Sequence, residues 1–126
     1  MEICIVDDDK VYQLLTKKLI QRIDENISIK TFFNGEDAYK YFSENQSRSN
    51  VLLLDINMPK MNGWEFLEHL EQDGIENANI YLATSSIAYS DLEKAKQYNS
   101  LKGYLIKPIT KEKLLKITQL TKIESN

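Results

Sequence analysis

The chain has 126 residues, a formal net charge of −3 and a pI near 5.2, which suits one domain and does not favour a nucleic-acid partner. No stretch approaches the roughly 18 apolar residues that span a bilayer, and the first apolar run begins too early to leave room for a signal peptide. The single cysteine, Cys4, cannot form an internal disulfide. A cytoplasmic location is therefore the default expectation, with no membrane contact.

Short apolar or alternating runs predict five strands, each followed by a stretch with helical spacing. The strands are expected at about residues 3–6, 27–32, 51–54, 79–83 and 103–106. Helices are expected at about 9–23, 36–45 and 89–98, with a third helix carrying Phe66, Leu67 and Leu70 and a last one carrying Leu114, Ile117 and Leu120. The polar segment 44–50 is predicted to be a surface loop.

The spacing of apolar residues also predicts which helix faces are buried. In the first helix the stripe consists of Val11, Leu14, Leu15, Leu19 and Ile23, and such a stripe normally faces the core. In the second helix, Ala38, Tyr41 and Phe42 are expected to face inward. The fourth helix has only a weak stripe, Leu92 and Ala95.

Five βα units with short connections predict an α/β fold: a doubly wound, five-stranded parallel sheet with helices on both faces. The expected strand order is the flavodoxin-like 2-1-3-4-5, within one domain over residues 1–126. In this order strands one and three are neighbours at the switch point, so Asp7 and Asp8 should lie close to Asp55. Thr84 and Lys107, which follow strands four and five, belong to the same sheet edge.

Three carboxylates packed together repel one another, and a divalent cation is the natural compensation. Mg²⁺, with Mn²⁺ as an alternative, accepts one or two carboxylates together with a phosphate oxygen. Asp55 ends its strand alone and is the best candidate for a nucleophile that forms an aspartyl-phosphate, whereas Asp7 and Asp8 are better placed to hold the metal. Lys107 and Thr84 add an ammonium group and a hydroxyl that suit a phosphoryl group.

With these residues in this order, the sequence resembles the receiver domain of two-component response regulators along essentially its whole length. The resemblance is carried by Asp7-Asp8, by Asp55 within the stretch Leu54 to Gly63, by Thr84 and by Lys107-Pro108. It implies that Asp55 is the phosphoacceptor, that Asp8 ligates the metal directly and that Asp7 often acts through water. It further implies a metal contact from the backbone carbonyl of Asn57, a cis Lys107–Pro108 bond, and a switch pair formed by Thr84 and Tyr104.

The resemblance implies a signalling switch that accepts a phosphoryl group from a phosphohistidine and catalyses only its own phosphorylation and dephosphorylation. The expected partners are a sensor histidine kinase or a histidine phosphotransfer protein, and a downstream protein that binds the face of helix four, strand five and helix five. The chain is expected to be a stand-alone bacterial receiver without an output domain, either monomeric or dimeric on phosphorylation. A role as a relay intermediate is an alternative.

Other interpretations stay open at this point. Asp7 and Asp9 fit the opening motif of haloacid-dehalogenase phosphatases, in which Asp7 would be the nucleophile. Asp9 is otherwise expected to cap the first helix. A flavodoxin, in contrast, is rejected, because three aspartates after strand one would repel a flavin phosphate unless a metal ion intervened. Tyr104 is alternatively simple sheet packing, and Trp64 is either a core residue or a partly exposed contact residue.

Overall fold

The computed structural model describes residues 1–44, 51–75 and 79–125, with side chains described as far as residue 119. Strands and helices alternate along the chain, as the sequence predicts. The strands are β1 (Glu2–Val6), β2 (Ser28–Phe32), β3 (Val51–Leu54), β4 (Asn79–Thr84) and β5 (Leu101–Ile106). The helices are α1 (Lys10–Ile23), α2 (Gly35–Glu44), α3 (Gly63–Gln72), α4 (Tyr89–Ala95) and α5 (Lys111–Ser125).

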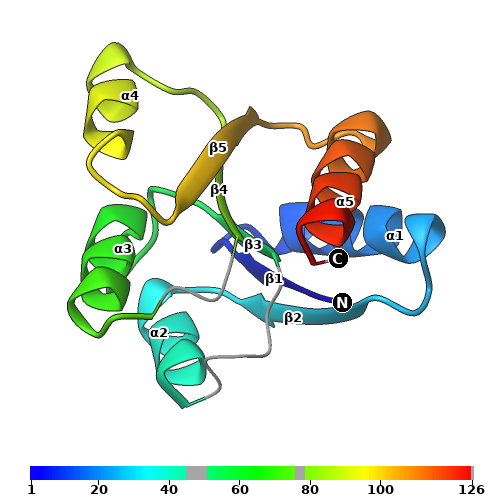
Figure 1. The fold of residues 1–126 in the computed structure, drawn as a ribbon, viewed down its shortest axis with the longest axis horizontal. Coiled ribbons are helices and arrows are strands. Elements are labelled where there is room, and N and C mark those ends of the chain that lie inside the picture. Colours follow the sequence, from blue (N-terminus) through cyan, green and yellow to red (C-terminus); the bar gives the residue numbers. More distant parts are fainter. Residues whose placement is uncertain (45–50, 76–78, 126) are drawn as a thin grey trace.

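The five strands form a parallel sheet in the order β2-β1-β3-β4-β5, which confirms the predicted topology. Helices α1 and α5 cover one face of the sheet, and α2, α3 and α4 lie on the other (Figure 1). The central strands β1 and β3 are buried along their whole length, because helices cover both of their faces. Their register pairs Val6 with Leu54, so the chain leaves both strands at the same level of the sheet.

Helices α2 and α3 bury most of the side chains that their spacing predicts, and Tyr41 of α2 is partly buried. Phe66, Leu67 and Leu70 of α3 are at most 1% exposed, and Ala38 and Phe42 of α2 are equally buried. Together with side chains of β1, β3 and β4 they form one continuous apolar cluster. Burial of this surface is the main source of stability on that face.

Helix α1 does not bury the stripe that its spacing predicts. Val11, Leu14 and Leu15 are 67%, 54% and 57% exposed, whereas Gln13, Thr16 and Ile20 are the buried residues of the helix. Leu19 and Ile23 are partly buried against the core. The prediction is therefore wrong for the first three residues, because polar contacts at the start of the helix set its rotation.

Two of these polar contacts orient the first turn of α1. The Asp9 carboxylate caps the helix by accepting hydrogen bonds from the N–H groups of Val11 and Tyr12, at 3.0 and 3.1 Å. The side-chain amide of Gln13 points into the sheet and lies 2.9–3.1 Å from the carbonyl oxygens of Ile5, Asp7 and Phe32. Gln13 thus faces inward, which turns Leu14 and Leu15 toward the solvent.

Four further predictions differ from the structure or lie outside it. Helix α4 ends at Ala95 rather than near residue 98, since the next amides, of Gln97 and Tyr98, bond to carbonyls three residues back, as in turns. No residue of α4 is buried. Strand β5 begins two residues earlier than predicted. The predicted loop lies outside the described residues apart from Glu44, which ends α2, and so does the side chain of Leu120.

In the part of the chain that is described, no helix has the length and apolar character to cross a membrane.

Candidate functional site

The three predicted acidic residues meet at the carboxyl edge of the sheet. Asp7 is 1% exposed and Asp55 is 8% exposed, whereas Asp8 is an exposed residue. One carboxylate oxygen from each residue lies within 4.8 Å of the other two. The pairing of β1 with β3 causes this approach, since the amide of Asp55 donates a hydrogen bond to the carbonyl of Val6 at 2.9 Å.

The cluster shifts the protonation equilibria of its buried members. Burial raises the pKa of Asp55 from 3.8 to about 6, and the negative charge of Asp7 adds to this effect. The ammonium group of Lys107 and the N–H of Ile56 act in the opposite direction. Burial also raises the pKa of Asp7, although its hydrogen bond with Lys107 counteracts the shift. The positive charge of Lys107 therefore does not fully compensate the negative charge of the acidic residues.

Lys107 enters this cluster from the end of β5. Its ammonium group forms an ion pair with Asp7 Oδ2 and lies 3.9 Å from Asp55 Oδ2. The Lys107–Pro108 peptide bond is cis, as the resemblance implies. The backbone amide of Lys107 donates to the carbonyl of Thr84 at 2.8 Å, so the end of β4 holds the lysine in place. The side chain of Lys107 is only 15% exposed.

The donor atoms of this cluster fit a hard divalent cation. Three carboxylates supply only oxygen ligands, and the exposed Asp8 leaves one side open for water molecules, which Mg²⁺ retains when it binds to proteins. No imidazole or thiol belongs to this group of residues. Asp7, Asp8 and Asp55 could therefore hold Mg²⁺ or Mn²⁺.

The other five residues singled out in the sequence differ in burial and contacts. Thr84 is 3% exposed at the end of β4, where its hydroxyl donates to the carbonyl of Ser86 at 3.1 Å. Tyr104 in β5 is 48% exposed, so its side chain is not packed into the core. Asn57 is exposed two residues after Asp55. Asp9 is the cap of α1, as predicted. Trp64 is 8% exposed and stacks on Tyr98, which makes it a largely buried residue.

Gly63 also contributes to the site, although the sequence reasoning assigned it no role. A Cβ atom at Gly63 would lie 2.5 Å from the carbonyl oxygen of Asp55 and 2.9 Å from Cα of Ile56. Its amide donates to the carbonyl of Ile56 at 2.8 Å. Only glycine allows α3 to begin this close to the segment that carries Asp55.

Gln13 and Tyr12 were likewise missed. Gln13 anchors the carboxyl ends of β1 and β2, and the Tyr12 ring lies beneath the ammonium group of Lys107, 4.2 Å from ring centroid to Nζ. Their position shortly after the aspartates was the available signal. It was not decisive, because the rotation of α1 decides whether residues 12 and 13 face the site or the solvent.

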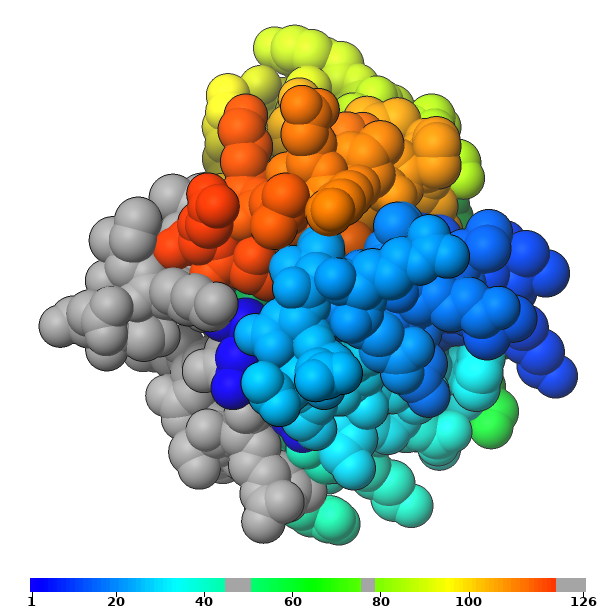
Figure 2. Space-filling view, turned by 90° about the vertical axis from the view of Figure 1, so that its right-hand side faces the viewer, coloured from blue at the N-terminus to red at the C-terminus, as the bar shows by residue number. Residues whose placement is uncertain are grey.

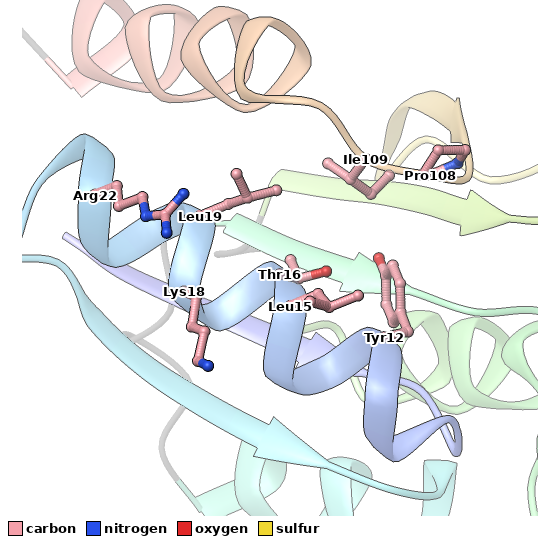
Figure 3. A pocket seen from close by; sticks show the side chains of 8 residues that line it. All are labelled: Tyr12, Leu15, Thr16, Lys18, Leu19, Arg22, Pro108 and Ile109. Carbon is pink, nitrogen blue, oxygen red and sulfur yellow. The ribbon is translucent and has the colours of Figure 1, made fainter.

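A groove beside the site separates α1 from the start of α5. It has a volume of about 300 Å³, and its lining includes Tyr12, Leu15 and Leu19 from α1 and Pro108 and Ile109 from the connection after β5 (Figure 3). Figure 2 looks onto this side of the molecule, where the blue side chains of α1 lie beside the orange β5–α5 segment. The exposed Val11 and Leu14 extend the apolar surface beyond the groove. We refer to Val11, Leu14 and Leu15 as the α1 patch.

Comparison with known proteins identifies the family. The family model described as "Response regulator receiver domain" matches residues 3–119. Two-component response regulator 24 of Arabidopsis thaliana is 30% identical over 113 residues, covering 90% of this chain and 78% of that protein. The probable methanogenesis regulatory protein FilR2 of Methanothrix harundinacea is 28% identical, covering 89% of this chain and 75% of that protein.

Solved structures agree with these sequence matches. The chemotaxis protein CheY4 of Vibrio cholerae superposes with a TM-score of 0.79 at 26% identity, covering 95% of this chain and 97% of that one. A two-component response regulator from Legionella pneumophila gives a TM-score of 0.85 at 25% identity, with 97% and 98% covered.

Several relatives are much longer than this chain, and some of them come from eukaryotes. The chain spans 14% of the length of the 3',5'-cyclic-nucleotide phosphodiesterase regA of Dictyostelium discoideum, and 22% of the response regulator ARR11 of Arabidopsis thaliana. The family is therefore found in an amoeba and a plant, and membership in it does not establish a bacterial source. The match over residues 3–119 and the shared fold show that this chain belongs to the response regulator receiver domain family.

Proposed function

We propose that this chain is a phosphorylation switch whose Asp55 accepts a phosphoryl group from a phosphohistidine on a sensor kinase or a histidine phosphotransfer protein. The observation that carries the proposal is the convergence of three carboxylates and one ammonium group at a single sheet edge. When bound, a divalent cation would neutralise negative charge on the acidic residues and on the incoming phosphoryl oxygens. The nucleophile and the fixed positive charge come from the chain itself.

The surroundings of Asp55 favour it as the nucleophile. The N–H of Ile56 donates to Asp55 Oδ1 at 2.9 Å, and the other oxygen, Oδ2, faces Lys107. In the proposed transfer an Asp55 oxygen attacks phosphorus, the P–N bond to the donor histidine breaks, and the imidazole nitrogen leaves with the bonding electron pair. Lys107 lies close enough to Oδ2 to neutralise charge on the phosphoryl oxygens.

The environment of Asp7 disfavours the phosphatase alternative, in which Asp7 would attack. Asp7 Oδ1 accepts a hydrogen bond from the Asp9 amide at 2.9 Å, and Oδ2 is paired with Lys107. Asp9, the acid of that alternative, is committed to capping α1. Both oxygens of Asp7 thus already have partners, whereas Asp55 has a less constrained oxygen.

For the response to phosphorylation, we propose the face formed by α4, β5 and α5. Thr84, the last residue of β4, supplies the hydroxyl of the proposed switch, and Tyr104 in β5 is the aromatic residue that would change its position. Helix α4 has no buried residue, so moving it costs little apolar contact. Tyr89 on α4 is 77% exposed and Lys94, Lys96 and Lys102 are exposed too, which suits binding of a downstream protein.

For the phosphoryl donor, we propose docking on the α1 patch. Leu15 lines the same groove as Tyr12, whose ring contacts Lys107 of the site, and Val11 and Leu14 belong to the same part of α1. Lys17, Lys18 and Arg22 on this helix are exposed. An amphipathic donor helix with acidic residues at its edge would match both the apolar centre and the basic flank. Docking there would bring a phosphohistidine toward Asp55.

Intact-mass spectrometry after incubation with acetyl phosphate and Mg²⁺ tests the proposal. The unmodified chain should gain one phosphoryl group, and chelation of the metal should prevent it. Asp55→Asn should gain none, and Asp7→Asn should show whether the adduct requires a neighbouring acid. An adduct that survives in Asp55→Asn but disappears in Asp7→Asn would transfer the nucleophile role to Asp7 and support the phosphatase alternative instead.

A further inference from the structure

Lys107 has three partners in the site, the carboxylates of Asp7 and Asp55 and one group that is not a carboxylate. Its ammonium group lies over the ring of Tyr12, 4.2 Å from the centroid, well inside the roughly 6 Å within which a cation is attracted by an aromatic face. We propose that Tyr12 is a positioning residue, whose ring holds the Lys107 ammonium group next to Asp55 by a cation–π interaction. This inference rests on the proposed function, because it concerns the lysine used in phosphoryl transfer.

The contact occurs where little water competes with it. The side chain of Lys107 is 15% exposed, and Tyr12 is itself partly buried where α1 starts above the site. A cation–π contact contributes most when the cation has lost part of its hydration shell. Asp7 and Tyr12 thus take the place of water around this ammonium group.

The ring face of Tyr12, rather than its hydroxyl, makes the contact. The hydroxyl oxygen is buried beside Thr16, and among the described residues it makes no hydrogen bond of ordinary geometry. Burial, with the nearby charge of Asp7, raises the pKa of Tyr12 well above its ordinary value, so the phenol stays neutral at physiological pH. Phenylalanine should therefore replace Tyr12 without loss, which is not expected if the hydroxyl held the lysine.

The ring also gives Lys107 a partner that a metal ion does not attract. Asp7 is a candidate ligand of the divalent cation, so Lys107 and the cation compete for the same carboxylate. A neutral phenol ring offers no ligand to a hard cation such as Mg²⁺, which prefers water and carboxylate oxygens. Tyr12 can therefore restrain Lys107 near Asp55 Oδ2, at 3.9 Å, when Asp7 is engaged elsewhere.

Nuclear magnetic resonance of the lysine side chains tests the contact without measuring activity. Protons on Cε of Lys107, assigned with Lys107→Arg, should be shifted upfield by the ring relative to the exposed lysines. The shift should persist in Tyr12→Phe and on addition of Mg²⁺, and it should vanish in Tyr12→Leu. An unshifted Lys107 in the unmodified chain, or one unaffected by Tyr12→Leu, would overturn the proposal.

Phosphorylation by acetyl phosphate then tests the consequence of the contact. Tyr12→Phe should react at nearly the rate of the unmodified chain, whereas Tyr12→Leu should react about five- to twentyfold more slowly. Fluorinated phenylalanines at position 12 keep the shape of the ring but weaken its negative face, so the rate should fall stepwise with the number of fluorines. This series decides the matter even if Tyr12→Leu fails to fold.

The outcomes separate this inference from the function on which it rests. No phosphoryl adduct on the unmodified chain would count against the proposed function, whereas the Lys107 shift can be observed either way. A normal adduct, with equal rates for phenylalanine and all its fluorinated forms, would leave the proposed function standing and remove the role of Tyr12. A loss in Tyr12→Phe as large as that in Tyr12→Leu would also overturn the inference, because it would assign the effect to the hydroxyl.

Discussion

Helices α1 and α3 both begin beside the acidic cluster, and both carry an apolar stripe at helical spacing. In α3, Phe66, Leu67 and Leu70 are at most 1% exposed. In α1, Leu14 and Leu15 are more than half exposed, and Gln13, which faces the sheet, is buried instead. Similar patterns thus lead to opposite arrangements in two helices of the same fold.

The difference teaches that hydrophobic periodicity determines the rotation of a helix only when no stronger local contact opposes it. Helix α3 has its capping box, formed by Asn62 and Glu65, in phase with its apolar stripe. In α1, the Asp9 cap and the three carbonyls around Gln13 fix a different phase. Buried backbone carbonyls require hydrogen-bond donors, and this requirement prevails over the burial of two leucines.

Removing a buried side chain of α3 should have the largest effect on stability. We expect Phe66→Ala to lower the free energy of unfolding by about 3–5 kcal/mol, because it leaves a cavity in a closed apolar cluster. Denaturant titration followed by circular dichroism measures this change. A loss below about 1 kcal/mol would contradict the idea that α3 is held by its apolar face.

Removing the polar anchor of α1 should have the next largest effect. Gln13→Ala should lower the free energy of unfolding by about 1–3 kcal/mol, since the carbonyls of Ile5 and Asp7 lose a buried side-chain donor, whereas the carbonyl of Phe32 keeps the amide of Asp7. Gln21→Ala is the matched control, as Gln21 lies on the exposed side of the same helix. Equal effects of the two substitutions would show that Gln13 does not anchor α1.

The acidic cluster from which both helices start should make stability depend on pH. The unfolded chain releases the Asp55 proton near 3.8, whereas the folded chain retains it to about pH 6. Between these values the folded state binds more protons, so the stability contributed by Asp55 falls as pH rises from about 4 to 6. Asp55→Asn should remove this decline and raise the free energy of unfolding at pH 7 by about 1–2 kcal/mol.

Urea denaturation of the unmodified chain and of Asp55→Asn at pH 5 and pH 7 measures the difference. Some decline should remain in the variant, because the pKa of Asp7 is raised as well. If the free energy of unfolding of the two proteins depended on pH in the same way, the pKa of Asp55 would not be raised by burial and by Asp7. Added Mg²⁺ should stabilise the unmodified chain at pH 7 by an amount that grows with metal concentration.

The sequence predicted the parts of this molecule that depend on strand order and on residues at strand ends. The proximity of Asp7 and Asp55 could be predicted, because neighbouring parallel strands have their carboxyl ends at the same edge of the sheet. The roles of Gln13 and Tyr12 depend on the rotation of α1 within one turn, which spacing alone did not resolve. The end of α4 was misjudged for a related reason, since a helix without buried residues has little apolar pattern to mark its limits.

The smallest expected effect on stability belongs to the α1 patch. Leu14→Ala and Leu15→Ala should change the free energy of unfolding by less than about 0.5 kcal/mol, because both side chains are already exposed. If the patch is the docking surface, the same substitutions should slow phosphoryl transfer from a phosphorylated histidine protein more than transfer from acetyl phosphate. The measurement is the rate of transfer from the histidine protein divided by the rate from acetyl phosphate in each variant. Gln21→Ala is the control on the same helix. A ratio that stays constant would show that the exposed leucines result only from the phase set by Gln13, whereas a falling ratio would mean that α1 gives up core contacts at these positions in order to present a binding surface.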